Sequence, residues 1–237
     1  MPLSPLPPSW AAASELPPRA DLRHVDTWLF DLDNTLYPPG TEFVTLIEGR
    51  MTDRVMRETG LDRPAAYELQ KRYLHEHGTT LAGMMAHHGV EPHAFLEEVH
   101  DVAIDSLTPD FALNRALEAL PGRRLIFTNA SEAHAVRVLA HLGMTELFAE
   151  VFHLEAADLL PKPQPEAFAR MMARHAVTPG PTAFFEDSVK NLAPASELGM
   201  TTVLVGPHAS ADASAFVDHR TDRLEPFLAR ARTSAHA

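Results

Sequence analysis

Two aspartates, two residues apart, follow directly on an apolar run near the start of the chain. Segment 27–30 is mainly apolar, and Asp31 and Asp33 stand immediately after it. A carboxylate in this position can attack phosphorus as a nucleophile, while a second acid protonates the leaving oxygen and later deprotonates water. Alone, such a pair is also typical of a turn or a solvent-facing loop. It indicates phosphoryl chemistry only if other polar groups converge on it.

Two further charged groups occur in the second half of the chain. Asp187 follows the apolar segment 182–185, and Lys162 stands between two prolines that stiffen its backbone. A phosphate monoester repels a carboxylate, so a divalent cation must lie between them before attack. We expect Mg²⁺, which prefers a few carboxylates with water and substrate oxygens, held by Asp31, Asp187 and the main-chain carbonyl of Asp33. Lys162 is expected to bind and offset the remaining negative charge.

A polar pair after a third apolar segment supplies candidates for phosphate binding. Thr128 and Asn129 follow segment 124–127. The Thr128 hydroxyl can donate to the transferring phosphoryl group, and the main-chain N–H groups of Leu32 and Asn129 can add further donors. The residues expected to position the lysine and the last aspartate are Glu186, Ser188 and Asn191.

The apolar segments are short and alternate with helical patterns. Helices are expected at 132–142, ended by Gly143, and at 164–175, opened by Pro165. Apolar strands that alternate with helices indicate a parallel sheet covered on both faces. Ligands of such sheets bind at the carboxyl ends of the strands, so we expect the polar groups to meet there. The expected strands are 27–30, 124–127, 182–185 and 201–205.

The region between the first two of these strands has a different pattern. Apolar side chains recur at helical spacing, and no strand pattern interrupts the region before residue 107. We therefore expect a helical cap at 39–109, inserted after the first strand of a core formed by 23–38 and 110–237. The residues at helical spacing are Phe43, Ile47, Met51 and Val55.

Composition narrows the range of partners. The formal net charge of -12 disfavours nucleic acids and anionic membrane surfaces as partners. A small phosphorylated metabolite remains possible, because a metal and a few placed cations can overcome the background charge. The first twenty residues hold six prolines, with neither a basic leader nor an unbroken apolar segment. We expect a flexible tail at 1–22 and a cytoplasmic location.

These residues together resemble the four motifs of hydrolases of the haloacid dehalogenase (HAD) superfamily. The motifs are matched by residues 31–35 (DLDNT), by Thr128 with Asn129, by Lys162, and by residues 186–188 with Asn191. The resemblance covers residues 22 to 206. It implies an α/β fold with a Rossmann-like parallel sheet core and a helical cap. It also implies an aspartyl-phosphate intermediate and a Mg²⁺ cofactor.

A closer resemblance is to the pyrimidine 5′-nucleotidase branch of that superfamily. It is carried by residues 30–38 (FDLDNTLYP), 73–81 (YLHEHGTTL), 99–101 and 127–129. His153 departs from the branch, in which an acid is expected after the strand. The resemblance implies hydrolysis of a pyrimidine nucleoside 5′-monophosphate, UMP or CMP. The cap residues expected to select it by stacking and hydrogen bonding are Tyr73, His77 and Thr79.

Other functions fit parts of the same pattern. A dehalogenase on this scaffold attacks carbon and needs neither Asp33 as an acid nor a metal. A phosphomutase shares every core residue and differs in whether its cap excludes water from the phosphoenzyme. A sugar-phosphate or phosphoglycolate phosphatase differs in what the cap recognises. A binding protein without catalysis is disfavoured, because a site that had lost its activity should lack at least one charged residue. All four are present: Asp31, Asp33, Lys162 and Asp187.

Overall fold

A computed structural model of the chain describes residues 19–234. The flexible tail expected at 1–22 therefore lies mostly outside the described residues. Its last part was predicted wrongly: Leu22 is fully buried, and Asp21 forms a parallel bridge with Arg232 near the other end of the chain. The apolar Leu22 side chain packs into the hydrophobic core, so the ordered structure begins before residue 22.

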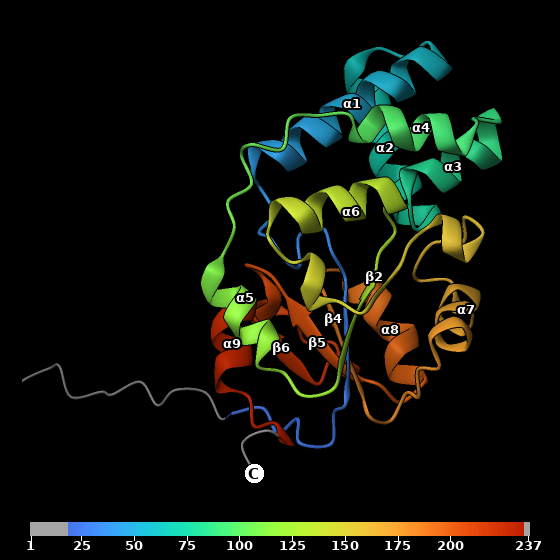
Figure 1. Cartoon of the computed structure of the whole chain (residues 1–237). Coiled ribbons are helices and arrows are strands. Elements are labelled where there is room, and N and C mark those ends of the chain that lie inside the picture. The colour runs from blue at the N-terminus through green and yellow to red at the C-terminus, as the bar shows by residue number, and fades with distance from the viewer. Residues whose placement is uncertain (1–18, 235–237) are drawn as a thin grey trace, which may run out of the picture.

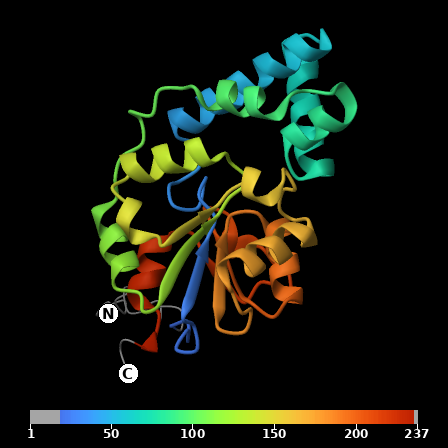
Figure 2. The same cartoon turned by 45° about the vertical axis from the view of Figure 1, so that its right-hand side comes forward.

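The described residues contain one sheet of six parallel strands in the order β3-β2-β1-β4-β5-β6 (Figures 1 and 2). The strands are β1 (Thr27–Phe30), β2 (Arg123–Phe127), β3 (Glu150–Phe152), β4 (Thr182–Glu186), β5 (Thr201–Val205) and β6 (His219–Thr221). The four expected strands are the central ones, β2, β1, β4 and β5. The two edge strands, of three residues each, were not predicted. The Rossmann-like α/β fold is confirmed.

Helices cover both faces of this sheet. Trp28 and Phe30 of β1 belong to one apolar cluster, together with α5, α6 and α9. Leu29 points to the opposite face and belongs to a second cluster with α7 and α8. This alternation follows from the period of two in a strand, and both faces are buried because the sheet is parallel. The helices are α5 (Phe111–Glu118), α6 (Glu132–His141), α7 (Pro165–His175), α8 (Val189–Glu197) and α9 (Leu224–Arg230).

Of the five helices between β1 and β2, the first four form a separate layer beyond the carboxyl ends of the strands, next to α6 (Figures 1 and 2). They share an apolar cluster that includes Val55, Tyr73 and Phe95. Leu154, from the loop after β3, is buried in the same cluster. The helices are α1 (Glu42–Thr59), α2 (Arg63–His77), α3 (Thr80–His88) and α4 (Pro92–His100). The exact division into cap and core at residues 38–39 and 109–110 stays a prediction.

Local sequence signals set the ends of these four helices. Thr41, Asp62 and Thr79 are N-caps whose side chains accept hydrogen bonds from backbone N–H groups in the first turn. Gly60 ends α1 in the left-handed conformation, which glycine adopts without steric cost. Gly78 ends α2 at a φ of 83°, and a Cβ placed on it would lie 2.7 Å from the Lys162 carbonyl oxygen. Only glycine lets α2 come this close to the Lys162 loop.

The short 3₁₀ helices are Thr145–Leu147, Glu155–Ala157 and Ala209–Ala211. Among the described helices, none is both long enough and apolar enough to cross a lipid bilayer.

Candidate active site

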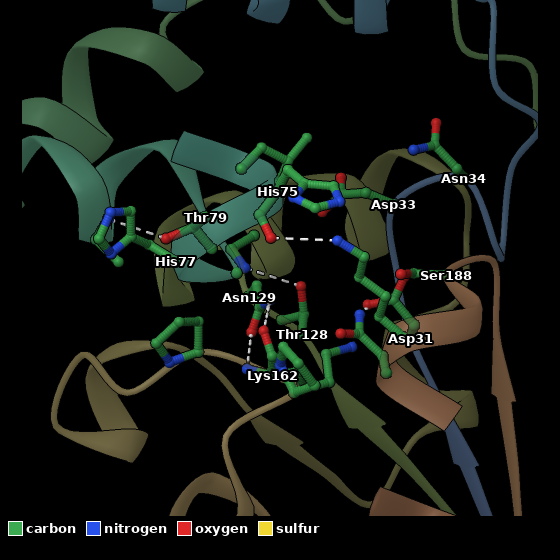
Figure 3. Close-up of a pocket in the computed structure, with 18 of the residues that line it drawn as sticks. Asp31, Asp33, Asn34, His75, His77, Thr79, Thr128, Asn129, Lys162 and Ser188 are labelled. Atoms are coloured by element: carbon green, nitrogen blue, oxygen red, sulfur yellow. Dashed lines mark hydrogen bonds and ion pairs between the residues drawn. The ribbon is translucent and has the colours of Figure 1, made fainter. Parts of the chain in front are cut away.

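A large cavity lies between the carboxyl ends of the central strands and the α1–α4 helices. Its volume is about 1240 Å³. Asp31 follows β1, Thr128 follows β2 and Asp187 follows β4, and all three line the cavity. Figure 3 shows Asp31 and Thr128 there. The parallel strands carry these side chains to one edge of the sheet, as the strand pattern predicted. Lys162 reaches the cavity from the loop before α7.

Lys162 occupies the centre of a buried polar network. Its side chain is 1% exposed, and its Nζ donates hydrogen bonds to Asp31 Oδ1 at 2.7 Å, Glu186 Oε2 at 2.7 Å and the Phe127 carbonyl at 2.6 Å. Burial alone would lower the pKa of Lys162, but the charges of Asp31 and Glu186 outweigh it and raise the pKa to about 12. The lysine is therefore a fixed positive charge.

Asn129 fixes the backbone of the same loop. Its Oδ1 accepts a hydrogen bond from the Lys162 N–H at 2.8 Å, and its Nδ2 donates to the Lys162 carbonyl at 3.1 Å. These two bonds tie the end of β2 to the Lys162 loop. The Asn129 side chain thus has a positioning role that the sequence analysis, which considered its backbone N–H, did not predict.

Three carboxylates crowd around this single ammonium group. One ligand oxygen from each of Asp31, Glu186 and Asp187 lies within 4.8 Å of the other two. Burial and the charge of Glu186 raise the pKa of Asp31, against the opposing effect of Lys162. Burial and the charges of Glu186 and Asp31 likewise raise the pKa of Asp187. The site therefore carries more negative charge than its protein neighbours balance.

A divalent cation fits this donor set. Glu186 already uses both oxygens, because Oε2 accepts from Lys162 and Oε1 accepts from the Ser188 N–H at 3.1 Å. Asp31 Oδ1 also accepts from Lys162, but its Oδ2 accepts only from the Thr35 hydroxyl at 3.3 Å, and a hydroxyl can rotate away whereas the backbone N–H on Glu186 cannot. Asp31 and Asp187 are therefore the carboxylates that would hold the ion, and hard carboxylate oxygens suit Mg²⁺. The expected ligand set, which also includes the main-chain carbonyl of Asp33, stays a prediction, with Glu186 and Ser188 in supporting positions.

We expect Asp187→Asn to stabilise the metal-free protein at alkaline pH. The pKa of Asp187 is raised above its ordinary value of 3.8, so its contribution to stability is present at lower pH and is lost as pH rises through the folded-state pKa. Urea denaturation without metal should show the variant more stable at about pH 8, with the difference vanishing near pH 4. Added Mg²⁺ should stabilise the natural protein more than the variant. A variant less stable at pH 8 without metal would contradict this account.

Asp33 lines the cavity beside Asp31, but its surroundings differ. Its Oδ1 accepts a hydrogen bond from Tyr37 Oη and pairs with His134 Nε2 at 2.7 Å. Burial would raise the pKa of Asp33, yet the charge and hydrogen bond of His134, with the hydrogen bond from Tyr37, lower it to about 2. The surroundings therefore shift the pKa values of these two neighbouring carboxyls in opposite directions, so the two groups have different environments at one cavity. In the view of Figure 3, Asp33 lies above Asp31 and Lys162.

A comparison with protein families gives one match that spans most of the chain. The model of haloacid dehalogenase-like hydrolases matches residues 25–199, which include Asp31, Thr128, Lys162 and Asp187. The chain belongs to the haloacid dehalogenase-like hydrolase family. The HAD resemblance predicted from the four motifs is therefore confirmed.

Individual relatives of this HAD-like hydrolase are distant. Phosphate metabolism protein 8 of Saccharomyces cerevisiae is 25% identical over 194 residues, which cover 75% of this chain and 60% of the yeast protein. Two solved structures share the fold. A HAD phosphatase from Thermococcus onnurineus has a TM-score of 0.56 at 20% identity, with 84% of this chain and 94% of that chain covered. The L-2-haloacid dehalogenase from Xanthobacter autotrophicus has a TM-score of 0.54 at 18% identity, with 86% and 97% covered.

Most of the remaining core residues chosen from the sequence line the same cavity. Thr128 lines the cavity, and its Oγ1 accepts a hydrogen bond from the Ala130 N–H at 3.0 Å, so its proton can be directed at a ligand. Ser188 and Asn191 line the cavity near the start of α8. The Leu32 side chain is fully buried, and the expected contact of its backbone N–H with phosphate stays a prediction.

The cap residues chosen from the sequence divide into two groups. His77 and Thr79 line the cavity, as expected of groups that contact a substrate. Tyr73 does not: it is buried in the apolar cluster of the cap, where its ring stacks on His87 and its hydroxyl bonds His88 Nε2 at 2.9 Å. A Cβ on Gly83 would collide with the Tyr73 ring, so this tyrosine holds α2 against α3. Its proposed role in specificity was wrong.

Several site residues were missed in the sequence. His134 on α6 and Tyr37 in the loop after β1 both contact Asp33. Tyr37 stood within the quoted segment 30–38, so the signal was present without an assigned role. His134 is separated from Asp33 by 101 positions and occupies a buried helical position, which sequence periodicity marks only as core. Lys71 and Lys190 also line the cavity.

Proposed function

We propose that this HAD-like hydrolase is a Mg²⁺-dependent phosphomonoesterase that acts through an aspartyl-phosphate. The observation that carries the proposal is the pairing of Asp31 with Asp33 at one cavity. Asp31 accepts a hydrogen bond from Lys162, whereas Asp33 is bound separately by His134 and Tyr37. A dehalogenase needs no second acid, so this pairing favours phosphoryl transfer.

In the first half of the proposed reaction, Asp31 attacks phosphorus and the leaving oxygen departs on the opposite side. Lys162 and the Thr128 hydroxyl stabilise charge on the phosphoryl oxygens. A bound Mg²⁺ would reduce the repulsion between the carboxylate and the dianionic phosphate. The bound phosphate dianion raises the pKa of Asp33, so this carboxylate takes up a proton from solvent and then delivers it to the leaving oxygen.

In the second half, water attacks the phosphorus of the aspartyl-phosphate. Asp33 is then a carboxylate and takes the proton of that water, so one residue serves as acid and base in turn. The free Asp31 and inorganic phosphate result. A mutase would instead transfer the phosphoryl group to a second substrate. Release of inorganic phosphate in proportion to substrate consumed, with no isomerised phosphate ester, distinguishes the two.

We propose a nucleoside 5′-monophosphate, UMP or CMP, as the substrate. The cavity of about 1240 Å³ accommodates a molecule of this size beside the phosphate site. His77 and Thr79 line the wall supplied by the cap, and apolar side chains such as Met51 and Leu74 line it as well. A surface that combines hydrogen-bonding and apolar groups suits a nucleobase. Sugar phosphates and phosphoglycolate are the alternatives, which an activity comparison separates.

The prediction that tests the substrate concerns His77→Gln. We expect it to lower kcat/KM for UMP and CMP roughly tenfold, the cost of losing one good contact, and to change kcat/KM for a small sugar phosphate little. Phosphate release with UMP, CMP, AMP, GMP and several sugar phosphates measures this directly.

The matched control is His87→Gln. His87 Nε2 lies 3.2 Å from His77 Nε2, but His87 does not line the cavity. The variant therefore removes the contact between the two histidines and leaves the His77 side chain at the cavity. It should leave the preference among substrates unchanged. Sugar phosphates that outrun the pyrimidine nucleotides in the natural protein would refute the substrate, while leaving the phosphatase assignment intact.

A further inference from the structure

His134 lies in a closed position between the sheet and the cap helices. It is 2% exposed and sits on the first part of α6, which runs between the sheet and the α1–α4 layer (Figures 1 and 2). Its ring stacks on Phe43 at 5.7 Å between centroids and lies 4.1 Å from the His100 ring. Phe43 lies in the first turn of α1 and His100 is the last residue of α4, so the first and the last of the four cap helices both contact this ring.

The only polar partner of the His134 ring among the described residues is Asp33. Nε2 lies 2.7 Å from Asp33 Oδ1, whereas Nδ1 is buried without a hydrogen-bond partner among those residues. The ring orientation is therefore determined by two aromatic contacts and one bond to the carboxylate. A buried polar side chain that leaves one nitrogen unpaired lowers stability, so core packing alone does not account for a histidine here.

Both bonds to Asp33 end on the same oxygen. Tyr37 Oη donates to Oδ1, and His134 Nε2 contacts Oδ1 as well. Neither Tyr37 nor His134 bonds to Asp33 Oδ2. The Asp33 side chain is 31% exposed and lines the cavity. Two donors on one oxygen fix the rotation of the carboxyl group, and the other oxygen remains available to the leaving group.

We propose that His134 is a positioning residue that directs Asp33 Oδ2 toward the leaving oxygen, with Tyr37 as the second anchor. The inference rests on the proposed phosphomonoesterase function and adds a residue to it. His134 touches neither substrate nor phosphorus in this role. It acts through the orientation of Asp33, and Phe43 and His100 make that orientation depend on the seated cap.

The test compares two esters that differ in their need for a proton. A nucleoside monophosphate releases an alkoxide, which must be protonated, whereas p-nitrophenyl phosphate releases a stable phenolate. His134→Leu fills the buried space with an apolar side chain and removes the hydrogen-bond donor to Asp33. It should lower kcat/KM for the nucleotide roughly 10²-fold, as misplacement of an acid does, and for p-nitrophenyl phosphate less than about tenfold.

Rescue by a conservative variant separates positioning from packing. His134→Gln restores a donor at about the position of Nε2, so it should recover most of the nucleotide activity. Tyr37→Phe removes the second anchor with little change in volume and should shift the nucleotide-to-aryl ratio in the same direction. Equal losses on both esters, or a Gln variant as impaired as the Leu variant, would overturn the proposal.

Crystal structures of the natural protein and the two His134 variants supply a readout independent of activity. The Asp33 carboxyl should keep its orientation in the Gln variant and rotate in the Leu variant. An unmoved carboxyl in the Leu variant overturns the inference. If the natural protein hydrolyses neither ester, the proposed function fails, and the carboxyl orientation alone then decides the role of His134. If the Leu variant does not fold, the structures of the His134→Gln and Tyr37→Phe variants provide the test instead. The Asp33 carboxyl should keep its orientation in the former and rotate in the latter.

Discussion

Asp31→Asn is expected to abolish phosphate release while leaving the fold intact. The amide has the shape of the carboxylate but not its nucleophilicity, and it removes one charge that would hold Mg²⁺. Loss of the nucleophile should reduce kcat on the order of 10⁵-fold or more. Lys162 keeps its bonds to Glu186 and the Phe127 carbonyl, so the buried network stays paired. Steady-state phosphate release and rapid-quench labelling with radioactive substrate measure the two parts of this result.

The matched control is Asp53→Asn, on the exposed side of α1. Asp53 pairs with Arg63 near the surface, away from the cavity, so its loss should leave kcat unchanged. The natural protein and this control should form an acid-stable phosphoenzyme, and the Asp31 variant should not. Substantial Mg²⁺-dependent hydrolysis by the pure Asp31 variant would mean that another group is the nucleophile.

Lys162→Met is expected to have the largest effect on stability of any single replacement at the site. The methionine fills a similar volume, but Asp31 and Glu186 lose the ammonium that lies 2.7 Å from each of them. Breaking a buried pair by removing one partner costs about 3–5 kcal/mol, because uncompensated charge is left inside the protein. Phosphate release should be lost as well, since the same ammonium stabilises the phosphoryl oxygens. Urea denaturation measures the free energy of unfolding.

The pH dependence distinguishes lost charge from lost packing in this variant. Near pH 4 the Asp31 carboxyl, whose pKa is raised by burial, is protonated, so the difference in stability between Lys162→Met and the natural protein should shrink. A packing defect would give the same difference at every pH. Lys190→Met serves as the control: this exposed lysine lines the cavity and donates to the His75 carbonyl at 3.2 Å. Its loss should change stability by no more than about 0.5 kcal/mol.

The central part of the fold was predictable because its signals are local. Each of β1, β2, β4 and β5 is a short apolar run that ends in a polar or glycine-containing turn, and the parallel arrangement follows from the intervening helices. The convergence of Asp31, Thr128 and Asp187 then follows from the sheet itself. The edge strands β3 and β6 escaped prediction because three residues are too few to show a periodic pattern.

Residues that depend on tertiary packing were not predictable in the same way. His134 and Asp33 are 101 positions apart, and only the packing of α6 beside the loop after β1 brings them together. Tyr73 shows the opposite error. Aromatic and polar at once, it has the chemistry of a ligand contact, but its place on α2 faces the interior of the cap. The residue type indicated which chemistry each side chain can perform, and tertiary packing determined whether that side chain lines the cavity.

The burial of Leu154 in the apolar cluster of the cap has a consequence for exchanging caps between relatives. Leu154 follows β3 and so belongs by sequence to the core segment, yet its side chain is enclosed by residues of the cap, with Leu159 packed against the same cluster. The two layers are therefore not interchangeable units joined only at their connecting loops. A chimaera that transplants residues 39–109 alone would pair a foreign apolar surface with these two leucines. Residues 153–160 must be transplanted together with the cap for the transplanted helices to pack against the core.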